Sequence, residues 1–257
     1  MGRTGDRVDP DVARLRIRSF GGQQFPASIE TAFRTLRDKA TKVLILDLRG
    51  NGGGVDEYGA LLVSQFTDRP FRYFDRIQVK TIDPSFTTWV PRTYENMRVG
   101  TVPDPAGGYL VTSREHSGVA EQQPAPAAFL GTAIVLIDGS TFSTAADVTA
   151  QLHHLKRSMF VGEETGGAYE GNTSGLNAMV ELPNSMLRLK VMMYGYWNAV
   201  ESDGRGRGTL PDYPVERRAA DLLAGVDVQL ERAIMLAREA LDGGPARDDG
   251  RASPHRP

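Results

Sequence analysis

Apolar and polar positions along the chain follow two periods, one typical of buried strands and the other of amphipathic helices. Two short apolar runs are each followed by a glycine- or serine-containing turn and then by a segment with helical spacing. The predicted strands are residues 42–48 and 132–137, and the helices after them are residues 55–66 and 141–155. This repetition predicts parallel winding and an α/β fold. Ligands of such folds bind at the carboxyl ends of the strands, so we expect both turns to face one crevice.

The other segments predict the rest of a single domain with an elaborated middle region. Strands are expected at residues 12–20, 158–162, 178–182 and 187–193, and helices at residues 26–40 and 221–241. Short apolar pieces separated by proline, glycine and polar residues fill positions 70–130, which we interpret as an elaboration, lid or substrate platform. The core domain is expected to span residues 12–242. Residues 1–11 are expected to be a disordered or truncated N-terminal segment, and residues 243–257 a disordered tail.

Composition limits the function more than the fold. The 257 residues are 40% hydrophobic and 24% charged, with a formal net charge of −2 and no cysteine. Such a composition is typical of a globular protein and excludes disulfides, zinc–thiolate sites and cysteine nucleophiles. The chain has no basic stripe interleaved with aromatic residues, which argues against nucleic-acid binding. No apolar run approaches the roughly 20 residues of a membrane helix, so no membrane insertion is expected.

The first ten residues are polar and lack the apolar core of a signal peptide. The chain as written is therefore expected to stay in the cytoplasm, and an extracytoplasmic location is expected instead if its N-terminus is truncated. The sequence leaves the oligomeric state open.

The first turn holds four glycines in five positions, Gly50-Asn51-Gly52-Gly53-Gly54, directly after the buried run. Glycine permits sharp turns, and successive bare backbone N–H groups form a site for negative charge. The loop is suited to hold a phosphate or a developing oxyanion, or else it is a tight turn without a ligand. A P-loop is not supported, because the later glycine-rich loop at residues 162–175 has no lysine. Asp47 and Arg49, at the strand end, are predicted to form a structural ion pair beneath the loop.

The second turn, residues 138–147, gathers hydroxyl side chains at the predicted start of a helix. One interpretation is helix capping alone, with Thr144 and Asp147 forming a capping box. The other is a nucleophilic Ser143 at a helix N-terminus, where the helix dipole and free N–H groups favour negative charge. Amides of this turn and of the glycine loop would then together hold an oxyanion. No Gly-x-Ser-x-Gly elbow surrounds Ser143, which argues against an α/β-hydrolase.

These motifs resemble those of the C-terminal-processing (tail-specific) serine peptidases, in the branch that includes the tricorn core protease. The resemblance extends over residues 12–242, and the matching segments are residues 46–54, 136–147, 161–167, 208–213 and 225–241. It implies a Clp-peptidase/crotonase-type core of ββα units. It also implies that Ser143 is the nucleophile and that the N–H groups of Gly53 and Thr144 hold the oxyanion. The implied substrate is an extended peptide or a protein C-terminus, and no metal or organic cofactor is implied.

The chain departs from this family at the general base. In one branch the base is a lysine at a position that corresponds to Ala168 here, so a Ser–Lys dyad with that geometry is excluded. The tricorn-like branch takes a histidine from upstream of the first core strand, where this chain has none. His153 and His154 follow Ser143 on the same predicted helix, which places His154 roughly 16 Å away, beyond hydrogen-bonding reach. His116, in the middle region, remains a candidate base.

An acid that orients the base is needed as well. Glu201 is the nearest match to the glutamate of the tricorn-like branch, and Glu170 and Asp203 are rivals. The leading hypothesis is a serine-type endopeptidase core with weak or no turnover as an isolated chain, since the family's base is missing. The main alternative is a non-catalytic module that binds a peptide or a small hydrophobic ligand in the same crevice. Crotonase-like acyl-CoA chemistry is a third reading, weakened by the placement of the serine.

Overall fold

The computed structural model describes residues 6–83, 98–201 and 206–243. It confirms an α/β fold, built on a six-stranded sheet in the order β1-β2-β3-β9-β10-β13. Neighbouring strands of this central sheet are parallel, except β1 with β2. The strands are β1 (Asp6–Asp9), β2 (Val12–Arg16), β3 (Val43–Asp47), β9 (Thr132–Ile137), β10 (Met159–Gly162) and β13 (Tyr213–Pro214). The carboxyl ends of β3, β9 and β10 therefore lie along one edge of the sheet, where the predicted turns begin.

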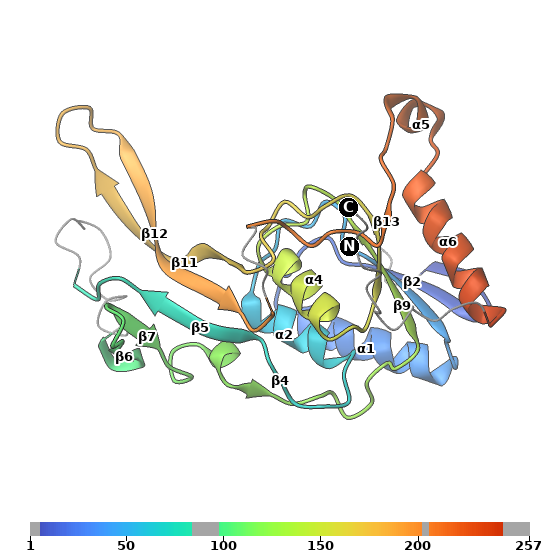
Figure 1. Cartoon of the computed structure of the whole chain (residues 1–257), viewed down its shortest axis with the longest axis horizontal. Coiled ribbons are helices and arrows are strands. Elements are labelled where there is room, and N and C mark those ends of the chain that lie inside the picture. Colours follow the sequence, from blue (N-terminus) through green and yellow to red (C-terminus); the bar gives the residue numbers. More distant parts are fainter. Residues whose placement is uncertain (1–5, 84–97, 202–205, 244–257) are drawn as a thin grey trace, which may run out of the picture.

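Helices cover both faces of the central sheet (Figure 1). On one face lie α1 (Phe25–Asp38), α2 (Asp56–Ser64) and α4 (Thr144–His154), and on the other lies α6 (Val228–Leu241). Strand β3 serves both layers, because its side chains alternate between the faces. Leu44 and Leu46 join the first core, whereas Val43 and Ile45 join the core beneath α6. Packing on two faces explains why this strand is a continuous apolar run.

A second, antiparallel sheet has the order β11-β12-β5-β7-β6 and combines the middle region with a later hairpin. Its strands are β5 (Phe74–Val79), β6 (Thr101–Pro103), β7 (Tyr109–Val111), β11 (Gly171–Glu181) and β12 (Arg188–Asn198). A small pair, β4 (Phe71–Arg72) with β8 (Glu121–Gln122), and the 3-10 helix η1 (Ser117–Val119) complete the middle region. The part expected to act as a lid includes residues 84–97, which lie outside the described residues.

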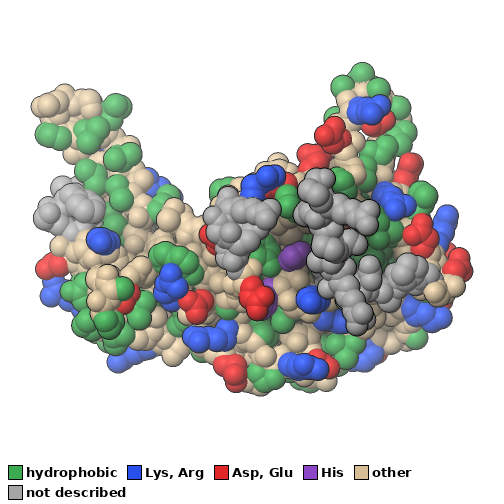
Figure 2. Space-filling view, in the orientation of Figure 1, with side chains coloured by type: hydrophobic (Ala, Val, Ile, Leu, Met, Phe, Trp, Pro, Cys, Tyr) green, Lys and Arg blue, Asp and Glu red, His purple; other side chains and the backbone are tan. Residues whose placement is uncertain are grey.

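Two arms rise from the body at opposite ends of the molecule (Figure 1). One is the β11–β12 hairpin, and the other is formed by α5 (Ala219–Ala224) and α6. The edge between the arms is hollowed in the space-filling view, and hydrophobic side chains are exposed on both arms (Figure 2). Among the described residues, no helix has the length and apolar character needed to cross a membrane.

The helix predicted at residues 221–241 is in fact two helices, α5 and α6. Gly225 ends α5 with a φ of +70°, a left-handed conformation that glycine adopts without the steric cost of a Cβ. Asp227 then caps α6, accepting the N–H of Leu230 at 3.1 Å. The break matters for the site, because it places Asp227 beside the end of β3.

Two loop or terminal expectations also need correction. Residues 6–9, expected within a disordered segment, form β1 and pair with β2. Strand β11 begins at Gly171, inside the segment expected to be a loop at residues 162–175. Residues 1–5 and the tail at residues 244–257 lie outside the described part of the chain, so the expectation of disorder there stays a prediction.

Candidate active site

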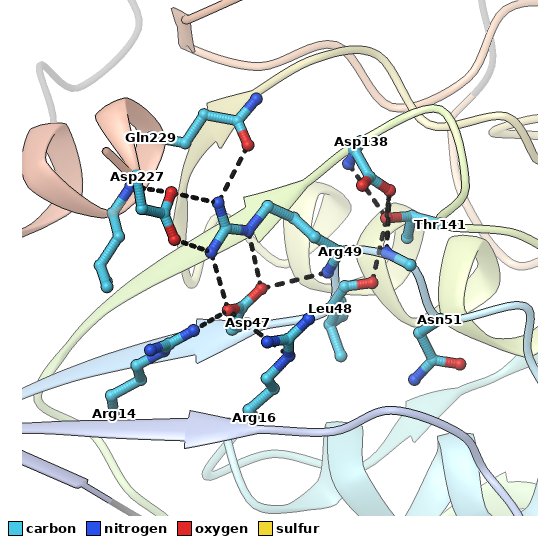
Figure 3. Close-up of polar contacts among 12 residues, drawn as sticks. Arg14, Arg16, Asp47, Leu48, Arg49, Asn51, Asp138, Thr141, Asp227 and Gln229 are labelled. Carbon is cyan, nitrogen blue, oxygen red and sulfur yellow. Dashed lines mark hydrogen bonds and ion pairs between the residues drawn. The ribbon is translucent and has the colours of Figure 1, made fainter. Parts of the chain in front are cut away.

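The glycine loop after β3 and the serine turn after β9 lie against each other, as the parallel winding predicts. The N–H of Gly50 donates to Asp138 Oδ1 at 3.0 Å, and the N–H of Phe142 donates to the carbonyl oxygen of Asn51 at 2.9 Å. The Thr141 hydroxyl is 3.2 Å from the carbonyl oxygen of Leu48 (Figure 3). Because these bonds join residues about ninety positions apart, they fix the two turns as one unit.

Ser143 occupies a strained backbone position at the start of α4. Its φ of +53° and ψ of −134° are rare for a residue with a side chain. The side chain is only half-buried, and its hydroxyl has no hydrogen-bond partner among the residues that the structure describes. Ser143, not Thr144, is the N-cap residue, so the predicted capping box of Thr144 with Asp147 is wrong. A strained, accessible hydroxyl between a strand and a helix is an arrangement used by nucleophiles.

Gly53 lies directly against this hydroxyl-bearing turn. A Cβ atom on Gly53 would be 2.7 Å from the Ser143 Cβ and 2.9 Å from the backbone nitrogen of Thr144. Thr144 is the first residue of α4, so its N–H has no partner within the helix. The N–H of Gly53 donates to Asn51 Oδ1 at 2.9 Å in this structure. The fold therefore brings together the backbones of Ser143, the expected nucleophile, and of Gly53 and Thr144, the expected oxyanion donors.

The loop after β10 also packs against the serine turn. The N–H of Gly167 donates to the carbonyl oxygen of Thr141 at 3.2 Å. A Cβ atom on Gly167 would be 2.4 Å from the Ala146 Cβ and 3.1 Å from the backbone nitrogen of Ser143. Only a residue without a side chain fits at this position. Loops from three neighbouring strand ends thus enclose the start of α4.

A buried cluster of ion pairs lies at the end of β3, directly before the glycine loop (Figure 3). Arg49 donates to the two oxygens of Asp47, at 2.9 Å each, and to those of Asp227, at 2.6 and 2.9 Å. Arg14 also binds Asp47, and Gln229 also binds Arg49. Burial alone would raise the pKa of Asp47, but Arg49 and Arg14 hold it below its ordinary value. The predicted ion pair is confirmed, and it extends to the start of α6.

His116 lies near the site but is engaged elsewhere. Its Nε2 is 3.4 Å from Asp56 Oδ2, and its Nδ1 accepts the N–H of Gly118 at 3.1 Å. In the neutral ring the proton is therefore on Nε2, facing Asp56. Asp56 Oδ1 in turn lies 2.8 Å from the Thr144 hydroxyl. The acid, rather than the histidine, contacts the helix start, so this group braces α2 and η1 against α4.

Glu201 and the histidines at the end of α4 are not brought to Ser143. The N–H of Glu201 donates to Nδ1 of His154 at 3.3 Å, and His154 is the last residue of α4. Ser143 precedes the first residue of that helix, roughly 16 Å away at about 1.5 Å per residue. Glu201 also lines a cavity of about 220 Å³ with His153 and Glu170. The rival Asp203 lies outside the described residues.

Sequence reasoning gave no role to two polar residues that hold the loops together. Asp138 Oδ1 accepts the N–H groups of Gly50 and Ser140, both at 3.0 Å. Asn51 is buried, and its Nδ2 donates to the carbonyl oxygen of Ile17 at 2.9 Å. A signal for Asp138 existed, since an aspartate before glycine often bonds the backbone two residues on.

The site has an acidic side chain in its interior that sequence reasoning assigned only to capping. Asp147 is buried and accepts hydrogen bonds from the amides of Asn172 and Asn198. Burial, and then the charge of Asp56, raise its pKa to about 8. The described residues contain no group of three or more histidine or acidic side chains suited to a metal ion.

Comparison with known structures supports the fold. A candidate peptidase from Parabacteroides merdae is 20% identical with a TM-score of 0.60, and the match covers 94% of this chain and 66% of that one. Mature CPAF is 17% identical with a TM-score of 0.59, covering 90% and 52%. The photosystem II D1 C-terminal processing protease is 18% identical with a TM-score of 0.51, covering 80% and 42%.

At these identities the likeness concerns the fold alone, and the chain spans between 42% and 66% of the length of these three proteins. A comparison with curated protein sequences finds no match. The sequence model of Peptidase family S41 matches residues 11–215, which include the glycine loop, the serine turn and the loop after β10. This chain belongs to Peptidase family S41.

Proposed function

We propose that this chain is the core of a serine peptidase in which the Ser143 hydroxyl attacks the carbonyl carbon of a peptide bond. The Oγ–C bond forms as the hydroxyl proton passes to a general base, and the carbonyl oxygen becomes an oxyanion held by the N–H groups of Thr144 and Gly53. The amine then leaves with a proton, and water hydrolyses the acyl–serine. Membership of Peptidase family S41 supports this class of reaction.

One observation carries the proposal, namely the approach of Gly53 to Ser143 and Thr144. A Cβ atom at residue 53 would overlap both the serine side chain and the Thr144 nitrogen. Only a bare backbone leaves room beside the hydroxyl for the oxygen of a substrate carbonyl. The Gly53 N–H would be shared between Asn51 Oδ1 and the oxyanion, while the Thr144 N–H has no partner within its helix.

The described residues supply no general base to the Ser143 hydroxyl. His116 has partners at both ring nitrogens, and His154 lies at the far end of α4. No described side chain hydrogen-bonds the Ser143 hydroxyl. We therefore expect slow turnover from the chain by itself, since positioned proton transfer contributes about 10²- to 10⁴-fold to rate.

The substrate would be an extended peptide, or the C-terminus of a protein, laid along the crevice between the loops. Phe142, next to the nucleophile, is 50% exposed, and Val55, after the glycine loop, is 40% exposed. These apolar side chains flank the proposed reaction centre in the sequence and are free to contact apolar substrate side chains. The non-catalytic binding module is the second candidate, favoured by the lack of a described base.

The test is labelling with a fluorophosphonate, followed by peptide mapping. We expect slow labelling over hours that is confined to Ser143, and its loss in Ser143→Ala. Ser140→Ala is the matched control, because Ser140 is an exposed serine of the same turn and should label at the wild-type rate. Labelling elsewhere, or none, would favour the binding module.

A further inference from the structure

Asp147 stands one helical turn beyond the proposed nucleophile and is almost inaccessible to solvent, with 1% of its surface exposed. Its N–H donates to the carbonyl oxygen of Ser143 at 3.0 Å, so the two residues share the first turn of the α4 region. Its side chain points away from solvent toward the second sheet. A carboxyl group in this place is close enough for its charge to influence the chemistry at Ser143.

No described cation balances this carboxyl group. Its partners are neutral amides: Asn172 Nδ2 lies 3.2 Å from each oxygen, and Asn198 Nδ2 lies 3.0 Å from Oδ1. Asn172 comes from β11 and Asn198 from β12, so the side chain ties the start of α4 to both strands of the hairpin. The anchoring by itself therefore does not require a negative charge.

The groups around Asp147 are acidic or neutral on every side. Asp56 faces it from the start of α2, and Tyr196 faces it from β12. Tyr73, between β4 and β5, is buried with no hydrogen-bond partner for its hydroxyl in the described part of the chain. His116 is directed at Asp56 rather than at Asp147. Burial and the neighbouring Asp56 raise the pKa of Asp147 to about 8, so the neutral form prevails at pH 7.

We propose that Asp147 is a positioning residue that works in its neutral form, anchoring the turn that carries Ser143 without adding a second negative charge, beside that of Asp56, near the oxyanion site. The inference rests on the proposed function. When Asp147 loses its proton, a buried negative charge stands about one helical turn from the developing oxyanion. Like charges at that separation, weakly screened, slow the attack on the order of tenfold or more.

The experiment measures the rate constant for fluorophosphonate labelling of Ser143 between pH 6 and pH 10 in the wild type and in Asp147→Asn. The asparagine is a permanent neutral counterpart, so dividing the two rates cancels the general rise of labelling with pH. We expect the ratio of wild type to variant to fall about tenfold between pH 7 and pH 10, with a midpoint near pH 8. A ratio that does not change with pH overturns the proposal.

Asn172→Ala gives a second test that does not need a folded Asp147→Asn protein. Asn172 donates to the carboxylate and thereby lowers the pKa of Asp147, so its removal favours the neutral form. The alkaline loss of labelling should therefore move to higher pH in this variant, and an unmoved midpoint contradicts the proposal. A wild type that never labels at Ser143 overturns the proposed function itself, whereas labelling with an unmoved midpoint overturns only the role of Asp147.

Discussion

Gly53 and Ser143 approach so closely that a Cβ atom on the glycine would stand 2.7 Å from the Cβ of the serine. The two residues are ninety positions apart and belong to turns after different strands of the central sheet. Their contact is the consequence of parallel strands ending at one edge, with loops short enough to meet there. It makes the glycine loop a direct part of the surroundings of the proposed nucleophile.

We expect Gly53→Ala to slow labelling of Ser143 by about a hundredfold, because the added Cβ displaces the N–H of residue 53 from the oxyanion, and losing one oxyanion donor has an effect of that size. The φ of +100° at Gly53 adds backbone strain to the overlap with Thr144. Gly52→Ala is the matched control, since a Cβ there meets no atom within 4 Å. Equal labelling rates in the two variants would show that the approach of Gly53 has no functional role.

The buried cluster beneath the loop should dominate the stability of this region. Arg49→Ala leaves the carboxylates of Asp47 and Asp227 without their main partner, and we expect a loss of about 3–5 kcal/mol in the free energy of unfolding. Arg16→Ala is the comparison, because Arg16 is 3.9 Å from Asp47 with its side chain 41% exposed, and exposed pairs contribute about 1 kcal/mol or less. Urea unfolding measures both losses, and similar values for the two variants would show that the buried cluster does not dominate the stability of this region.

Low pH should decrease the free energy of unfolding, partly because Asp47 becomes protonated. Its pKa is lowered in the folded protein relative to an ordinary value near 3.9, so its contribution is fully present above about pH 4. That contribution is lost as the pH falls through the folded-state pKa. We expect Asp47→Asn to destabilise the protein at pH 7 and to show a smaller further loss than the wild type between pH 5 and pH 2. A loss equal to that of the wild type would assign the acid sensitivity to other carboxyl groups.

His116 gives a test of where the base comes from. Because its Nε2 faces Asp56 and its Nδ1 accepts the Gly118 N–H, we expect His116→Gln to slow labelling of Ser143 less than tenfold. The expected loss is one of packing and bracing, visible as a lower melting temperature. A decrease of a hundredfold or more, with the melting temperature unchanged, would identify His116 as the base after all.

The sequence predicted the elements whose signals are local. The apolar runs that became β3 and β9, and the turns after them, follow from burial on two faces and from the need for glycine at positive φ. The break between α5 and α6 was not predicted, because an isolated Gly225 is compatible with a helix. The partner of Asp227 is Arg49, which follows β3 and is distant in the sequence. Likewise, Asp147 reads as an ordinary first-turn acid, because its partners lie 25 and 51 positions away.

The position of Glu201 shows another limit of predicting the site from the sequence. Glu201 was matched to the family's glutamate by its order along the chain. That order does not show which end of α4 the residue contacts. The hydrogen bond to His154 puts it at the far end. By contrast, the ion pair of Asp47 with Arg49 was predictable, since two residues of opposite charge flank one position at a strand end.

The most direct measurement is a crystal structure of the protein after reaction with diisopropyl fluorophosphate. We expect phosphorus bonded to Ser143 Oγ and a phosphoryl oxygen about 2.7–3.1 Å from the backbone nitrogens of Thr144 and Gly53. An adduct on another residue, or a phosphoryl oxygen directed away from both nitrogens, would contradict it.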